Sequence, residues 1–213
     1  MYESLDRFSL RKINYVKTRT TILKTCAQLL KEKTFATITV DEICQKAQIS
    51  RGTFFNYFPT KEHIFHYFIK IFTVKVALGI NKWSDDMKFT DKINKIYQIC
   101  VEEKEYTDFL GSYINFLLTV GEENNEMTLI DAEFAYFFKE INEIDFERYN
   151  NLTLGDLLGE ICEEAKRKGE ITMTGSKKEL SAMAIGVITG AYISDGIMPG
   201  KEHLSVLNGI WKM

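Results

Sequence analysis

Cationic, amide and hydroxyl side chains gather in one short segment, SRGTFFNYFPTKE, where they alternate with phenylalanines. Arg51, Asn56, Tyr57 and Lys61 of this segment are donors that can bind phosphate groups or the edges of bases. The surrounding third of the chain is basic: residues 1–66 contain 11 Lys and Arg against 6 Asp and Glu, whereas residues 67–213 contain 16 against 24. The chemistry that this pattern favours is noncovalent binding of a polyanion.

Residues suited to catalysis or metal binding are sparse. The chain has three histidines, His63, His66 and His203, and its sequence contains no catalytic triad, phosphate-binding loop or metalloprotease motif. His63 and His66 are three residues apart, but no third ligand stands at a suitable spacing. We therefore expect no enzyme activity, no metal site and no cofactor.

Cysteine usage and hydropathy indicate a cytoplasmic protein. The four cysteines are widely spaced without a CxxC motif, and the chain does not open with a basic, apolar and cleavable signal. The longest uncharged run, residues 180–194, is shorter than the roughly 20 residues that a membrane-spanning helix needs. We interpret this run as a buried helix and expect no membrane partner.

The elements that must position these side chains are predicted to be helices. Two prolines and abundant Leu, Lys, Glu and Ile favour an all-α fold. Apolar spacing predicts a helix over residues 9–33, a capping box at TVDE starts another over 40–47, and Ser50 can cap a third over 50–56. The two short helices predict a helix-turn-helix. Later helices are expected over 60–83, 90–103, 107–121, 125–148, 153–168 and 176–197.

Residues 21–65 resemble the DNA-binding domain of the tetracycline-repressor (TetR) family of bacterial transcription regulators. The resemblance is carried by IL in the first helix, Phe35, TVDEI, and SRGTFFNYF followed two residues later by KE. It implies a homodimer with a three-helix DNA-binding domain, residues 1–66, and a helical effector-binding and dimerisation domain, residues 67–213. Thr34 and Gln48 stand where the family often has glycine, so the turns at these two positions are either reshaped or strained. Phe55 stands where tyrosine is common and lacks the hydroxyl that could reach DNA.

The N-terminal residues of the 50–56 helix are predicted to read double-stranded DNA in the major groove. Arg51 can bind guanine in bidentate fashion, and Asn56 can pair with adenine. Gly52 allows close approach of the backbone, and Thr53 can contact a thymine methyl group, a base edge or a phosphate. The side chains of Arg51, Thr53 and Asn56 would confer sequence choice.

Phosphate contacts are expected from residues around the reading helix. Thr39 stands at a helix N-terminus, Tyr57 carries a phenolic hydroxyl, and Lys61 begins the next helix. Phe54 and Phe58, four residues apart, are expected in the core. The predicted DNA-binding set is Thr39, Ser50, Arg51, Gly52, Thr53, Asn56, Tyr57 and Lys61.

Small residues recur at every fourth position in the two C-terminal helices and form smooth stripes that let another helix approach closely. We interpret these helices, one pair from each subunit, as a dimer interface that sets two DNA-binding domains on a palindromic operator. The alternative is that the small residues pack only within their own subunit. The candidate interface residues are Gly155, Gly159, Ala182, Gly186, Gly190 and Ser194.

Aromatic residues are frequent between positions 72 and 138 and could line an apolar pocket for a small effector of unknown identity, preferably hydrophobic or aromatic. Helical spacing explains many of them equally well as ordinary core. The candidate pocket residues are Trp83, Tyr97, Phe109, Tyr113, Phe116, Phe134 and Phe137.

The expected function is transcriptional regulation through DNA binding. Repression released by an effector is favoured, because occlusion of a promoter requires DNA binding alone. Activation is an alternative, but it requires a polymerase contact that the sequence does not reveal. A further alternative is an interaction module whose C-terminal part mainly binds another protein.

Overall fold

The computed structural model describes residues 5–102, 109, 111–114, 127–197, 209 and 211, and every regular element among these residues is a helix. The predicted all-α class is confirmed. The chain divides into two compact units, one formed by residues 1–72 and 104–151 and the other by residues 73–103 and 152–213. The first unit therefore contains the whole of the predicted DNA-binding domain together with a later segment of the chain.

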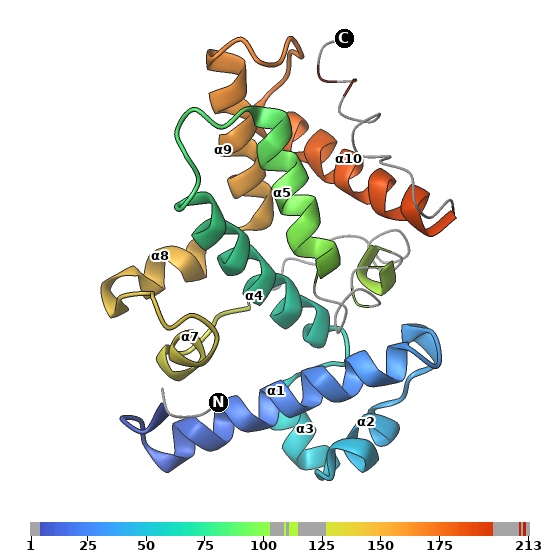
Figure 1. The fold of residues 1–213 in the computed structure, drawn as a ribbon. Coiled ribbons are helices and arrows are strands. Elements are labelled where there is room, and N and C mark those ends of the chain that lie inside the picture. Colours follow the sequence, from blue (N-terminus) through green and yellow to red (C-terminus); the bar gives the residue numbers. More distant parts are fainter. Residues whose placement is uncertain are drawn as a thin grey trace. The chain divides into compact units, whose positions relative to one another are not determined.

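In the first unit, α1 (Leu10–Leu30) is followed by η2 (Phe35–Thr37), α2 (Val40–Ala47), α3 (Arg51–Tyr57) and α4 (His63–Ile80), which continues beyond residue 72 (Figure 1). α1 packs against both α2 and α3. The small core between them includes Ile22, Ile43 and Phe54, each without exposed surface. Burial of these side chains holds the two short helices, which would be marginal in isolation.

The remainder of the first unit comprises α7 (Asp131–Phe137), η3 (Glu143–Asp145) and α8 (Phe146–Asn151). The single helix predicted over residues 125–148 is wrong. Residues 127–130 are not helical, and the backbone leaves the helix at Phe138, where φ is −137° and ψ is 78°. This break brings Phe146 into a stack on Phe134, with ring centroids 4.4 Å apart, so tertiary packing overrides the helical periodicity.

The second unit contains the end of α4, α5 (Phe89–Glu102), α9 (Leu154–Arg167) and α10 (Lys177–Ile197) (Figure 1). α9 and α10 pack along each other, and α5 contacts both. Gly169, with φ of 71°, follows Lys168, the C-cap of α9, and adopts the left-handed conformation found after many helix ends. Leu158 and Ala184 are among the residues buried in this unit.

Two of the described helices, α4 and α10, are long and apolar enough to cross a membrane by length and composition alone. The core helices of soluble proteins pass the same test. α4 supplies the fully buried Ile64, Phe65 and Tyr67, and α10 supplies Ala184 and Ala191. These apolar side chains are therefore used in packing within their units.

Candidate nucleic-acid interface

The turn between α2 and α3 determines how α3 is presented. Gln48 adopts the left-handed conformation, with φ of 57° and ψ of 44°, and is the one non-glycine residue with positive φ among the described residues. The amide of Ile49 donates to the carbonyl of Cys44 at 3.0 Å and closes the turn. Thr34 is instead extended, with φ of −72° and ψ of 151°. Thr34 and Gln48 are the two positions at which related sequences often have glycine. Gln48 retains the left-handed backbone, whereas Thr34 belongs to a reshaped turn.

α3 has one buried face and one exposed face. Phe54, and Phe58 directly after the helix, have no exposed surface, as predicted for core residues. Ser50 caps the helix by accepting from the amide of Thr53 at 3.0 Å. The residues of this segment that were predicted to contact DNA near the helix N-terminus are exposed or half-exposed: Ser50, Arg51, Gly52, Thr53 and Asn56.

Arg51 is held by a residue that the sequence reasoning missed. Its Nη1 donates to Oδ1 of Asp41 in the first turn of α2 at 2.6 Å, and both side chains are exposed. The guanidinium carbon lies 5.9 Å from the centre of the Phe55 ring. Because Asp41 is ten residues away on another helix, no spacing rule within one helix could have indicated this pair.

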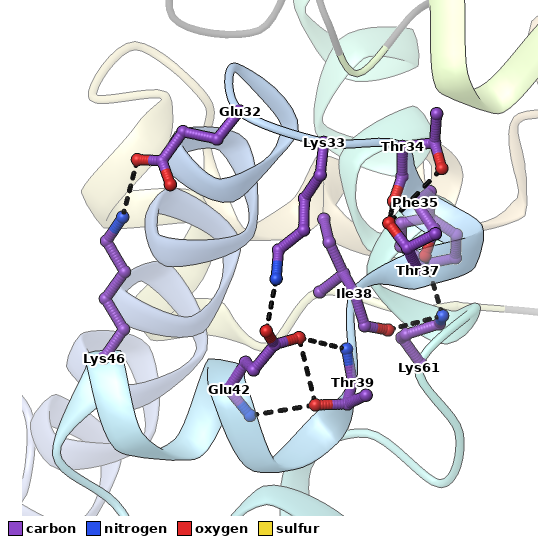
Figure 2. Close-up of polar contacts among 10 residues, drawn as sticks. All are labelled: Glu32, Lys33, Thr34, Phe35, Thr37, Ile38, Thr39, Glu42, Lys46 and Lys61. Carbon is purple, nitrogen blue, oxygen red and sulfur yellow. Dashed lines mark hydrogen bonds and ion pairs between the residues drawn. The ribbon is translucent and has the colours of Figure 1, made fainter.

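The N-terminus of α2 carries the predicted capping box (Figure 2). Oε2 of Glu42 accepts from the amide of Thr39 at 2.8 Å, and the Glu42 amide donates to the Thr39 hydroxyl at 3.2 Å. Lys33 donates to Oε1 of the same carboxylate. The hydrogen bond from Lys33, followed by those from Thr39, lowers the pKa of Glu42 to about 2. Thr39 is exposed at this end of the helix, where a phosphate contact was predicted.

Lys61 makes contacts that were not foreseen (Figure 2). Its Nζ donates to the carbonyls of Phe35 and Ile38, each at 2.8 Å, and lies 4.5 Å from the centre of the Phe35 ring. These bonds tie the start of α4 to the segment that leads into α2. An ammonium group has three donors, so one N–H remains beyond the two carbonyl bonds. Contact of Lys61 with phosphate stays a prediction.

Tyr57 lies at the C-terminal end of α3. It is half-buried, and its ring centroid is 5.0 Å from that of Tyr15 in α1. The aromatic contact fixes the ring against α1. Whether its hydroxyl binds phosphate also stays a prediction.

A buried charged network joins α1, α4 and α7 inside the first unit. Arg19 and Glu133 are 2% and 0% exposed, and Nη1 of Arg19 donates to Oε2 of Glu133 at 3.1 Å. The hydroxyl of Tyr67 donates to Oε1 of Glu133 at 2.7 Å, and the Ile130 amide donates to Oε2 at 3.0 Å. Burial raises the pKa of Glu133, and Arg19 opposes that rise. Sequence reasoning missed this pair, whose members are 114 residues apart.

The candidate pocket residues that the structure describes belong to both units. Phe109 and Tyr113 both contact Phe65, with ring centroids 5.7 and 5.8 Å away. Phe134 stacks on Phe146 in the same unit. The ring centroid of Phe137 lies 6.3 Å from that of Tyr67. Trp83 and Tyr97 belong to the second unit, where the Tyr97 hydroxyl donates to Asp195. Phe116 lies outside the described residues.

The candidate dimer residues differ in their surroundings. Gly155 and Gly159 face α10 of their own chain: the Ser181 hydroxyl donates to the Gly155 carbonyl at 2.8 Å, and a Cβ on Gly159 would lie 2.6 Å from Cγ of Lys177. Ala182 and Gly186 are exposed, and Gly190 and Ser194 are half-buried. Sequence reasoning missed three exposed isoleucines at helical spacing on the same side of α10. We call Ala182, Ile185, Gly186, Ile193 and Ile197 the outer face of α10.

Comparisons with known proteins agree with this arrangement. Residues 22–68 match the model of the family described as bacterial regulatory proteins, tetR family. The HTH-type transcriptional regulator EthR of Mycolicibacterium smegmatis is 51% identical over 43 residues, which are 20% of this chain and 20% of that protein. The chain thus matches only about a fifth of the length of this curated relative.

Solved structures share the fold over most of the chain. GusR of Salmonella enterica superposes with a TM-score of 0.59 at 15% identity, covering 92% of this chain and 93% of GusR. The transcriptional regulator FadR of Bacillus subtilis was solved in complex with stearoyl-CoA. It superposes with a TM-score of 0.52 at 14% identity, covering 90% of this chain and 95% of FadR. The helix-turn-helix segment at the N-terminus, residues 22–68, thus matches the tetR family of bacterial regulatory proteins.

Proposed function

We propose that this protein is a transcriptional regulator that binds double-stranded DNA, with residues 1–66 as its DNA-binding domain and residues 67–213 as its effector-binding and dimerisation domain. The observation that supports this best is the polar edge of α3, which runs from Ser50 to Asn56. It is exposed at the helix N-terminus, while Phe54 and Phe58 bury the opposite face. A helix presented in this way can reach base edges in the major groove with its first residues.

Base reading is assigned to Arg51, Thr53 and Asn56, close approach of the backbone to Gly52, and phosphate contacts to Thr39, Tyr57 and Lys61. Ser50 belongs to the DNA-binding set as the cap of α3. Arg51 has the donor geometry that guanine O6 and N7 accept. Thr39 is exposed at the N-terminus of α2, where the helix dipole favours an anion. Phosphate contacts would supply affinity and register, and base contacts would supply sequence choice.

A second copy of the chain is the partner that we propose for the outer face of α10. Ile185, Ile193 and Ile197 are 37%, 47% and 72% exposed, and a Cβ on Gly186 would meet nothing within 4 Å. Apolar side chains around small residues allow two helices to pack closely. A homodimer would carry two α3 helices, which fits a palindromic operator with half-sites about one helical turn apart.

An apolar small molecule is the proposed effector, acting in the cytoplasm and without a membrane partner. FadR of Bacillus subtilis was solved with stearoyl-CoA, and FadR of Thermus thermophilus, a repressor, with lauroyl-CoA. Acyl-CoA thioesters are therefore the first compounds to test. Binding that prefers a conformation unsuited to DNA would release the operator and end repression.

Selection and sequencing of sheared genomic DNA on the purified protein tests this function. Arg51→Ala serves as the control, since the side chain is exposed and its loss should leave the fold intact. We expect a palindrome close to a gene, recovered by the wild type and lost or degenerate with the control. Recovery of random DNA alone by the wild type would contradict operator binding and favour an interaction module. A fall in recovery with acyl-CoA would support derepression, and a rise would contradict it.

A further inference from the structure

Arg51 contacts two other side chains in this domain. Its Nη1 lies 2.6 Å from Oδ1 of Asp41, and its guanidinium carbon lies 5.9 Å from the centre of the Phe55 ring. Asp41 comes from α2 and Phe55 from the next turn of α3. Two side chains on different helices therefore define the direction of the guanidinium.

Folding stability does not explain this arrangement. The side chains of Arg51 and Asp41 are 61% and 64% exposed, and ion pairs at such exposure contribute little to stability. A charge-assisted hydrogen bond nevertheless restricts a side chain that otherwise samples many rotamers. Restriction before binding reduces the ordering that DNA binding must supply.

The contact leaves the guanine-reading donors available. A guanidinium has five N–H donors in a fixed plane, and guanine O6 and N7 require two of them. Because Asp41 binds Nη1, the hydrogens of Nε and Nη2 can face the base. Asp41 also places a negative charge beside the arginine, which disfavours the use of Arg51 as a simple phosphate contact.

We propose that Asp41 is a positioning residue that determines base specificity at α3. It holds Arg51 in the orientation that reads guanine and repels phosphate from the same edge. The inference rests on the proposed DNA-binding function. It predicts that Asp41 lowers affinity for random DNA and raises discrimination between sequences.

The test compares base preference in the full-length wild type, Asp41→Asn, Arg51→Ala and the double variant. Each protein selects from a randomised duplex library, and its affinity for random duplex is then measured over a range of salt concentrations. The matched control is Glu32→Gln, which removes the same charge from another exposed ion pair of this domain, with Lys46 at 3.6 Å. Thermal melts establish that each variant is folded.

We expect the wild type to prefer guanine at one position by about 5- to 150-fold, as a good bidentate contact provides. Asp41→Asn should reduce that preference several-fold, strengthen binding to random duplex and steepen its salt dependence by about one unit of slope. Glu32→Gln should leave the preference unchanged. In the Arg51→Ala background, Asp41→Asn should have no effect on base preference.

An unchanged preference in Asp41→Asn would overturn the inference, and so would an effect that persists without Arg51. Both results would leave the proposed function standing, provided that Arg51→Ala relaxes one guanine position. Failure of the wild type to enrich any sequence would overturn the proposed function and the inference with it.

Discussion

At the scale of single residues, Gln48 combines a left-handed backbone with a side chain that disfavours it. The conformation costs roughly 1 kcal/mol at a non-glycine residue. Gln48→Gly should therefore stabilise the domain by about 0.5–1 kcal/mol and raise Tm by roughly 1–4 °C. The matched control is Gln45→Gly in the exposed interior of α2, which should destabilise by up to about 1 kcal/mol. Equal losses of Tm in both variants would contradict the strain at Gln48.

Substitution of Lys61 tests its structural role separately from its proposed contact with phosphate. Its bonds to the Phe35 and Ile38 carbonyls predict that Lys61→Ala lowers the free energy of unfolding by about 1.5–3 kcal/mol, as expected for hydrogen bonds to a charged group. Lys46→Ala, which loses only an ion pair at 3.6 Å, should lose less than about 1 kcal/mol. Urea unfolding of both variants provides the measurement. Equal small losses would argue against a structural role for Lys61.

At the scale of elements, the start of α2 should be sensitive to acid. The folded-state pKa of Glu42 is about 2, below its ordinary value of 4.5, so its stabilisation is complete above the ordinary value and is lost as pH falls toward 2. Glu42→Gln keeps an acceptor for the Thr39 amide but cannot titrate. Thermal melts between about pH 5 and pH 2 should show a smaller decrease of Tm in Glu42→Gln than in the wild type. Parallel decreases would rule out the contribution of Glu42.

The pair of Arg19 and Glu133 holds α1 to α7 and should respond strongly to the loss of one partner. Arg19→Met leaves a buried carboxylate unpaired, which should reduce the free energy of unfolding by about 3–5 kcal/mol at neutral pH. Without Arg19, nothing from that side chain opposes the rise in the pKa of Glu133 caused by burial, so the variant should gain stability as pH falls through that raised pKa. Arg19→Met combined with Glu133→Leu should recover much of the loss. Additive losses in a double-mutant cycle measured by urea unfolding would contradict coupling of the pair.

Local signals predicted the elements of the N-terminal domain well, because their caps and turns lie within a few residues. TVDE, Ser50 and the apolar spacing of α1 each act over one or two helical turns. Such local signals could not predict side-chain contacts between distant segments of the chain. The contact of Arg19 with Glu133, the ion pair of Asp41 with Arg51 and the stack of Phe134 on Phe146 all depend on tertiary packing. For the same reason the helix predicted across Phe138 failed.

At the scale of the whole molecule, the outer face of α10 should control oligomeric state. Ile193→Asp places a charge on this face and should convert a dimer into monomers, because an unpaired carboxylate in an apolar interface is unfavourable. Lys166→Asp, on the exposed side of α9, is the control and should leave the mass unchanged. Analytical ultracentrifugation gives the mass of each. A wild-type monomer at micromolar concentration, or a dimeric Ile193→Asp, would contradict an interface at α10.

The most direct test of the central claim, that the exposed edge of α3 reads DNA, is a titration of wild type and Arg51→Ala against the selected operator and against random duplex. The account predicts that Arg51→Ala loses about 1–3 kcal/mol on the operator, loses much less on random DNA and no longer distinguishes one base pair. Equal losses on both duplexes would contradict it, because they would make Arg51 a phosphate contact and not a reader of sequence.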